Sequence, residues 1–113
     1  MTVDEIISEM EDFVEKKIPV GPNYYVEQAQ KLVVLMGDET DILHELQKGV
    51  AVKRVDFIDE GRSAAEARMR VEATEQYKQM QNQRAKCERI VEIIRIAKIQ
   101  SRMKSDEYKA GNL

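Results

Sequence analysis

The chain has 113 residues, of which 42% are hydrophobic and 35% charged, a composition typical of one globular domain rather than of a disordered chain. Its apolar runs are too short to cross a membrane, and its single cysteine, Cys87, excludes an internal disulfide and favours a reducing compartment such as the cytoplasm. The net charge of −3 is unevenly distributed, with 14 acidic and 6 basic residues in 1–60 and 7 acidic and 12 basic residues in 61–113. A basic second half is compatible with a nucleic-acid surface, with head-to-tail pairing of subunits, or with a solvated helix face.

The first predicted helix occupies residues 1–17. It opens with Thr2-Val3-Asp4-Glu5, a capping box in which the threonine and glutamate side chains satisfy free amides of the first turn. Apolar residues at spacings of one, three and four then give the helix one hydrophobic face. Residues 18–23, Ile-Pro-Val-Gly-Pro-Asn, hold two prolines and a glycine and end the helix. The sequence therefore predicts a semi-detached N-terminal helix, and its acidic start lacks the basic region of a signal peptide.

Residues 18–62 are predicted to form a helical pair. Asn23 caps the first helix, whose Tyr24-Tyr25 pair is more typical of a core anchor than of a base-stacking surface, and Gly37 is expected to stop it. Asp38 caps the second helix. Gly49 lies inside that helix and is expected to permit a close helix crossing. Residues 59–62, Asp-Glu-Gly-Arg, form the predicted turn that follows.

Residues 63–110 are predicted to form one long oligomerisation helix. Ser63-Ala64-Ala65-Glu66 is a second capping box, and neither glycine nor proline follows it before Gly111, where fraying begins. A helix of about 45 residues is about 68 Å long, whereas a compact chain of this size has a radius of gyration of about 13 Å. Such a helix cannot bury its apolar stripe against its own chain, which predicts self-association. The alternative is a helical hairpin that breaks between Gln79 and Gln83 and gives a monomeric bundle.

A heptad-like pattern runs along this helix, as in a coiled coil. Between residues 90 and 99 the apolar side chains cover one broad face, while Ile96 and Ile99 point away from it. A helix that is apolar on more than one side is buried on more than one side, so this segment is the candidate subunit interface. The expected interface residues are Tyr77, Met80, Cys87, Ile90, Val91, Ile94 and Ala97.

Side chains that perform catalysis or bind metals are scarce. One histidine, His44, and one cysteine do not complete a metal site, Ser63 is explained as a helix cap, and the isolated glycines form no phosphate-binding loop. We therefore expect no enzyme, no metal and no cofactor. Basic residues remain as candidates for binding nucleic acid, with an affinity multiplied by assembly of several copies. They are Lys48, Lys53 and Arg54 around Gly49, and Arg84 on the long helix.

The order of these segments resembles one protein family. A helix begins with Tyr24-Tyr25-Val26-Glu27-Gln28-Ala29, and residues 47–57, Gln-Lys-Gly-Val-Ala-Val-Lys-Arg-Val-Asp-Phe, precede a glycine turn and the long helix. This layout is similar to that of the T4-type phage recombination mediators, whose corresponding segment has a similar Val-Ala-hydrophobe-Lys, Arg and aromatic sequence. The resemblance covers most of the chain in layout and a short stretch in detail.

The resemblance implies a ring or barrel of subunits that binds single-stranded DNA and helps a recombinase displace the single-strand-binding protein, in the host cytoplasm if the protein is encoded by a phage. Lys53 and Arg54 match the family's basic pair, but here they are adjacent, which turns one of them by about 100° around the helix. We expect one all-α domain, 1–113, with three short helices followed by one long C-terminal helix, assembled as a homo-oligomer. The alternatives are a small phage protein that inhibits or adapts a host protein through a helical surface without binding DNA, and a structural bundle of a virion or scaffold.

Overall fold

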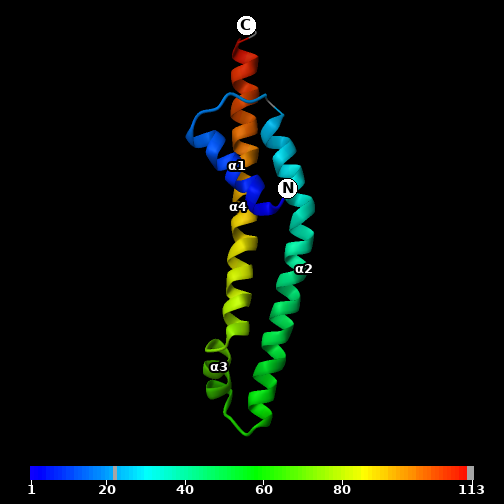
Figure 1. Ribbon diagram of the computed structural model, residues 1–113, viewed down its shortest axis with the longest axis vertical. Coiled ribbons are helices and arrows are strands. Elements are labelled where there is room, and N and C mark those ends of the chain that lie inside the picture. Colours follow the sequence, from blue (N-terminus) through cyan, green and yellow to red (C-terminus); the bar gives the residue numbers. More distant parts are fainter. Residues whose placement is uncertain (22, 112–113) are drawn as a thin grey trace. The chain divides into compact units, whose positions relative to one another are not determined.

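The computed structural model describes residues 1–21 and 23–111, and the side chains of 1–21 and 23–106. This part of the chain folds into four α-helices: α1 (Val3–Glu15), α2 (Tyr24–Asp59), α3 (Ala64–Glu72) and α4 (Glu75–Gly111) (Figure 1). The predicted all-α class and the long last helix are confirmed. Two expectations lie partly outside the described residues: Pro22 as a helix breaker, and fraying of the tail beyond Gly111 at Asn112 and Leu113.

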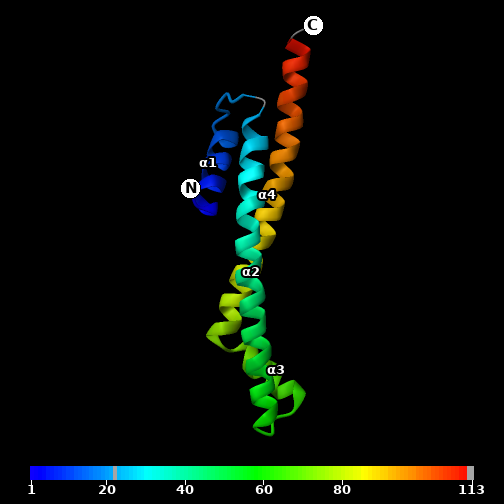
Figure 2. The ribbon, with the colours of Figure 1, turned by 90° about the vertical axis from the view of Figure 1, so that its right-hand side faces the viewer.

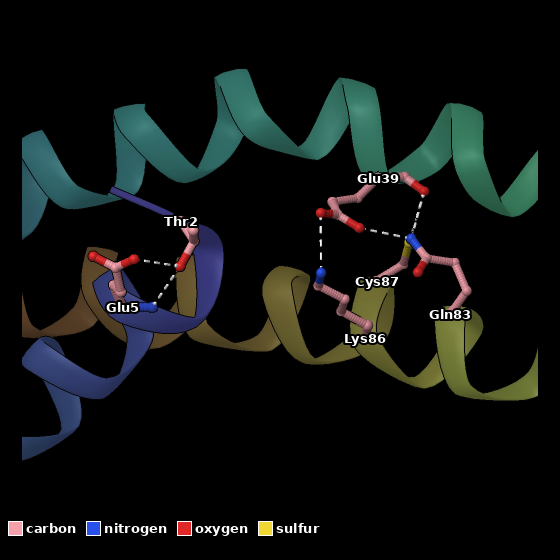
Figure 3. Close-up of polar contacts among 6 residues, drawn as sticks. All are labelled: Thr2, Glu5, Glu39, Gln83, Lys86 and Cys87. Atoms are coloured by element: carbon pink, nitrogen blue, oxygen red, sulfur yellow. Dashed lines mark hydrogen bonds and ion pairs between the residues drawn. The ribbon is translucent and has the colours of Figure 1, made fainter. Parts of the chain in front are cut away.

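Helix α1 begins and ends with specific capping contacts. Thr2 Oγ1 accepts a hydrogen bond from the Glu5 amide at 3.2 Å, as the capping box predicts. The Glu5 carboxylate accepts from the Thr2 hydroxyl at 3.1 Å (Figure 3). At the other end, the Ile18 amide donates to the Phe13 carbonyl at 3.0 Å and the Lys17 amide to the Val14 carbonyl at 3.3 Å. This is a Schellman motif, and Lys17 takes the φ of 53° that the motif requires. The helix therefore ends at Glu15, slightly before the predicted Lys17.

Helix α2 is one continuous helix of 36 residues. The expectation that Gly37 ends a first helix and Asp38 caps a second is wrong, because both residues lie inside α2. A glycine inside a helix costs only about 1 kcal/mol relative to alanine, which the burial of neighbouring side chains such as Leu32 offsets. A Cβ atom added at Gly49 would meet no atom within 4 Å, so this glycine does not mark a close helix crossing.

The turn between α2 and α3 forms where the sequence predicts it. Gly61 has a φ of 91°, which strongly favours glycine. The Arg62 amide donates to the Phe57 carbonyl at 3.3 Å and the Gly61 amide to the Ile58 carbonyl at 2.9 Å, a second Schellman motif. Ser63 Oγ then accepts a hydrogen bond from the Glu66 amide at 3.2 Å, which confirms Ser63 as the N-cap of α3.

The helix predicted over residues 63–110 is interrupted at Ala73 and Thr74, which separate α3 from α4. Thr74 Oγ1 donates to the Val71 carbonyl at 2.7 Å and accepts from the Tyr77 amide at 3.2 Å. These local hydrogen bonds offer the backbone an alternative to continuing the helix. The alternative break between Gln79 and Gln83 is wrong, because this segment lies inside α4.

The chain divides into two compact units, each built from helices that neighbour one another. Unit 1 comprises residues 1–37 and 89–113. In it, α1 lies alongside the beginning of α2, and the end of α4 runs opposite to that part of α2 (Figures 1 and 2). Its core holds Val3, Ile6, Ile7 and Met10 of α1, Tyr25, Ala29 and Leu32 of α2, and Ile90 and Ala97 of α4. Helix α1 thus contributes four buried side chains to this core.

Unit 2 comprises residues 38–88, which are the remainder of α2, α3 and the beginning of α4. Its buried hydrophobic residues are Ala67, Val71, Met80 and Cys87. Several aliphatic side chains of its part of α2 remain exposed, among them Val52 and Val55. Unit 2 therefore has a smaller buried hydrophobic core than unit 1.

Candidate functional site

Glu39 is the centre of a polar cluster that joins α2 to α4 within unit 2 (Figure 3). Gln83 Nε2 donates to the Glu39 carboxylate at 2.7 Å and to the Glu39 carbonyl at 2.9 Å, and Lys86 Nζ lies 3.1 Å from the other carboxylate oxygen. The hydrogen bond from Gln83, and then Lys86, lower the pKa of Glu39 against the opposing effect of burial. Because the carboxylate is satisfied by partners of its own chain, we interpret this cluster as a structural contact.

Cys87 borders the Glu39 cluster but is not an activated nucleophile. Its Sγ lies 3.6 Å from the Glu39 carbonyl, and its side chain is buried. Burial, followed by the negative charge of Glu39, raises the pKa of the thiol. Since the thiolate is the reactive form of cysteine, this environment suits a structural role for the buried Cys87 side chain.

The predicted nucleic-acid-binding residues all lie in unit 2. Lys48, Lys53 and Arg54 are exposed on α2, and Arg84 is half-buried on α4. Within the described side chains, none of these four cations forms an ion pair. A cation without an acidic partner is available to a phosphate group.

The structure brings two of these cations to one surface depression. Lys48 and Lys53 both line it, beside Gly49 and Val52. Arg54 follows Lys53 directly and therefore projects about 100° away around α2. The depression is also lined by two acidic residues, Glu45 and Asp56, which weaken its positive potential.

The Phe57 ring lies close to two cations of unit 2. Lys53 Nζ lies 5.5 Å from the centre of the Phe57 ring, and the Arg62 guanidinium lies 5.8 Å from it, distances at which a cation is attracted to an aromatic ring. Arg62 Nε is buried without a hydrogen-bond partner in the described part of the chain. The nearest acidic group is the Glu60 carboxylate, 3.7 Å from Arg62 Nε.

The tyrosine pair of α2 serves the core. Tyr25 is buried, and the Tyr24 ring stacks on Phe13 with 5.1 Å between the ring centres. The Tyr24 hydroxyl donates to the Glu9 carboxylate at 2.9 Å, and burial, followed by this contact, raises the pKa of Tyr24. The prediction of a core anchor is confirmed.

The predicted interface residues of α4 are mostly covered by the chain itself. Met80, Cys87, Ile90 and Ala97 are buried, and Tyr77 and Ile94 are half-buried. Val91 alone among the seven is exposed, at 56%. The buried residues follow spacings of seven, three and seven, and they include Ile90 rather than Val91. A subunit contact made of the four buried residues would require the helices to separate.

An apolar groove in unit 1 offers a different surface. It has a volume of about 320 Å³ and lies where α1 meets α4. The residues that line it are Met10, Glu11, Val14 and Glu15 of α1, Tyr25 of α2, and Ile93, Ile96, Ala97 and Gln100 of α4. Ile96 and Ile99 point away from the core, as the sequence predicts, and are exposed at 37% and 43%. The sequence did not reveal that α1 supplies the other wall.

The described residues contain no group of three or more His, Cys, Asp or Glu side chains placed to hold a metal ion. His44 is exposed on α2. In the part of the chain that the structure describes, no helix has the length and apolar character needed to cross a membrane. Comparisons with protein-family models, with curated proteins and with solved structures found no match.

Proposed function

We propose that the protein binds single-stranded DNA as a homo-oligomer and acts as an accessory factor of recombination, of the recombination-mediator type. The observation that carries the proposal is the group of unpaired cations in unit 2, of which Lys48, Lys53 and Arg54 are exposed. Phosphate contacts by lysine and arginine supply most of the affinity of sequence-independent nucleic-acid binding.

Assembly is part of the proposal because one chain presents few of these cations. A surface with three or four phosphate contacts binds weakly at moderate salt, whereas linked copies engage the same strand with a high effective concentration. The exposed aliphatic residues of α4 support such an assembly, since soluble monomers rarely expose contiguous apolar patches.

The role in recombination rests on the resemblance to T4-type mediators. In this role the protein would hold single-stranded DNA while a recombinase replaces the single-strand-binding protein. The segment that carries the resemblance, residues 47–57, also contains Lys48, Lys53 and Arg54. The same surface would therefore make the DNA contacts.

The double variant Lys53→Ala/Arg54→Ala tests the assignment of the DNA surface. Titration of a fluorescent oligothymidine by anisotropy, at roughly 50 and 200 mM salt, measures both affinity and salt dependence. We expect at least a tenfold loss of affinity. We also expect the salt slope to fall by about 0.7 for each phosphate of the single strand that the variant no longer neutralises.

The matched control is Lys17→Ala/Lys31→Ala, which removes the same charge from exposed lysines of unit 1. We expect this control to lose less than threefold in affinity. If the oligomer stays intact and both variants bind with the wild-type salt slope, the basic cluster of α2 is not the DNA surface.

A second candidate function is supported by α1. This helix carries Asp4, Glu5, Glu9, Glu11, Asp12 and Glu15 and no basic residue, and because its apolar side faces the core, most of these carboxylates are exposed. An acidic helical face suits a basic partner protein, as expected for a phage protein that inhibits or adapts a host protein. This function predicts no binding in the DNA titration at either salt concentration.

A further inference from the structure

Helix α4 carries an apolar stripe that the described side chains of unit 1 leave partly exposed. Ile96, Ile99 and Met103 are exposed at 37%, 43% and 51%. At about 100° per residue they fall within an arc of about 60°. Ile96 also lines the groove against α1, together with Val14, which is exposed at 42%. The stripe and the groove therefore form one continuous apolar surface in unit 1.

This surface has one acidic and one basic edge. Glu11 and Glu15 line the groove on the α1 side. The opposite side of the stripe is basic. Lys98 lies about 100° around α4 from Ile99, and Arg102 lies about 100° around α4 from Met103. Glu11 is paired with Arg89 at 2.6 Å, whereas Glu15, Lys98 and Arg102 form no ion pair within the described side chains. Unpaired charges of opposite sign thus flank the apolar stripe.

We propose that the partner of this surface is a second copy of the chain, with the α4 helices of neighbouring copies parallel to one another. Symmetry determines which charged edges of two copies meet. A rotation axis along α4 places the basic edge of one copy against the acidic edge of the next, whether the assembly is a dimer or a larger ring. A two-fold axis perpendicular to α4 places acidic edge against acidic edge and basic edge against basic edge, which is repulsive.

The length of the stripe indicates how the assembly behaves. Its spacings of three and four are those of the core positions in a coiled coil, but Glu92 and Asp106 occupy the next positions of the pattern on either side. A stripe bounded in this way buries little area, so association depends on the charged edges and on protein concentration. This inference rests on the self-association in the proposed function and specifies the surface and the orientation of that contact.

Ile99→Glu tests the apolar part of the contact. Sedimentation of the full chain should show at least a tenfold weaker association for this variant. The matched control is Val34→Glu in unit 1, where the aliphatic residue is exposed at 77%, and it should associate like the wild type. Because both positions are exposed, circular dichroism should show unchanged helix content. Equal association of the two variants would overturn the assignment of the stripe.

Charge reversal tests the parallel arrangement. Glu15→Lys alone and Lys98→Glu/Arg102→Glu alone should each weaken association, and their combination should restore it at least in part, because opposite edges meet again. An antiparallel contact predicts no restoration, since like edges still face each other, and that result would overturn the proposal.

These outcomes are separate from those of the DNA proposal. If the wild type assembles and binds DNA while Ile99→Glu still assembles, the stripe is wrongly assigned and the proposed function stands. If Ile99→Glu dissociates the oligomer but the assembled wild type does not bind DNA, the interface stands and the proposed function fails. If the stripe is instead occupied by another protein, the purified wild type remains a single chain at every concentration, which overturns the self-contact.

Discussion

At the scale of single residues, Glu39 has an environment that the sequence does not reveal. Its side chain is only 14% exposed, and its partners Gln83 and Lys86 lie more than 40 positions away along the chain. Because the folded-state pKa of Glu39 is lowered, its contribution to stability is present above the ordinary glutamate pKa of about 4.3. That contribution is lost as the pH falls through the folded-state value.

Glu39→Gln should therefore destabilise the protein more at pH 6 than at pH 3. At pH 6 the variant loses the ion pair with Lys86 and a charge-assisted hydrogen bond, a loss of about 1 kcal/mol in the free energy of unfolding. As the pH falls through the lowered folded-state pKa of Glu39, the wild-type carboxyl becomes protonated and comes to resemble the amide. Urea unfolding at both pH values measures this. Glu45→Gln on the exposed side of α2 is the control, and an equal deficit of Glu39→Gln at both pH values would contradict the account.

At the scale of helices, local capping chemistry was predictable and the interior of α2 was not. The caps at Thr2 and Ser63 and the turn at Gly61 depend on hydrogen bonds within a few residues, so the local sequence contains the information. Gly37 was misassigned because its cost of about 1 kcal/mol is smaller than the stabilisation from packing of α2 against distant segments. The break at Thr74 was not predicted because residues 63–110 contain neither glycine nor proline, although threonine is itself a good N-cap.

Replacement of Gly37 in α2 and of Gly61 in the turn by alanine should change the stability of the protein in opposite directions. Gly37→Ala should stabilise the protein by about 1 kcal/mol, because the residue is inside a helix and the added Cβ would meet nothing within 4 Å. Gly61→Ala should destabilise it by about 1 kcal/mol or more, because its φ is 91°. Thermal unfolding of both variants measures the two effects. Destabilisation by Gly37→Ala would indicate that α2 is not continuous through this position.

At the scale of the whole molecule, the sequence predicted that α4 contacts another subunit. Most of the residues it assigned to that contact are instead buried within this chain. Ile90 and Ala97 are covered by this chain's own helices, because α1 and α2 supply the apolar surface that a heptad pattern alone assigns to another subunit. The hydrophobic side chains of α4 that remain exposed include the stripe of Ile96, Ile99 and Met103. The partner of an apolar stripe depends on long-range packing, which periodicity does not specify.

The sequence predicted the cations of the candidate DNA surface but not the residues that surround them in the fold. The sequence identifies Lys48, Lys53 and Arg54 by their charge and by the resemblance, and all three are exposed. It does not show that Lys53 lies over the Phe57 ring, or that Glu45 and Asp56 share the depression with Lys48. The acidic neighbours weaken the positive potential of this surface in one chain. Strong binding of DNA is therefore expected only when several copies of the surface are assembled.

The most direct test of the account is sedimentation of the wild-type protein with a fluorescent oligothymidine at moderate salt, following the labelled DNA. We predict that the DNA sediments with a protein species several times the 13.1 kDa of one chain, and that its share of this species falls steeply as salt is raised. DNA that sediments as free oligonucleotide, or with a single chain, at every protein concentration would contradict the central claim that assembled copies bind single-stranded DNA together.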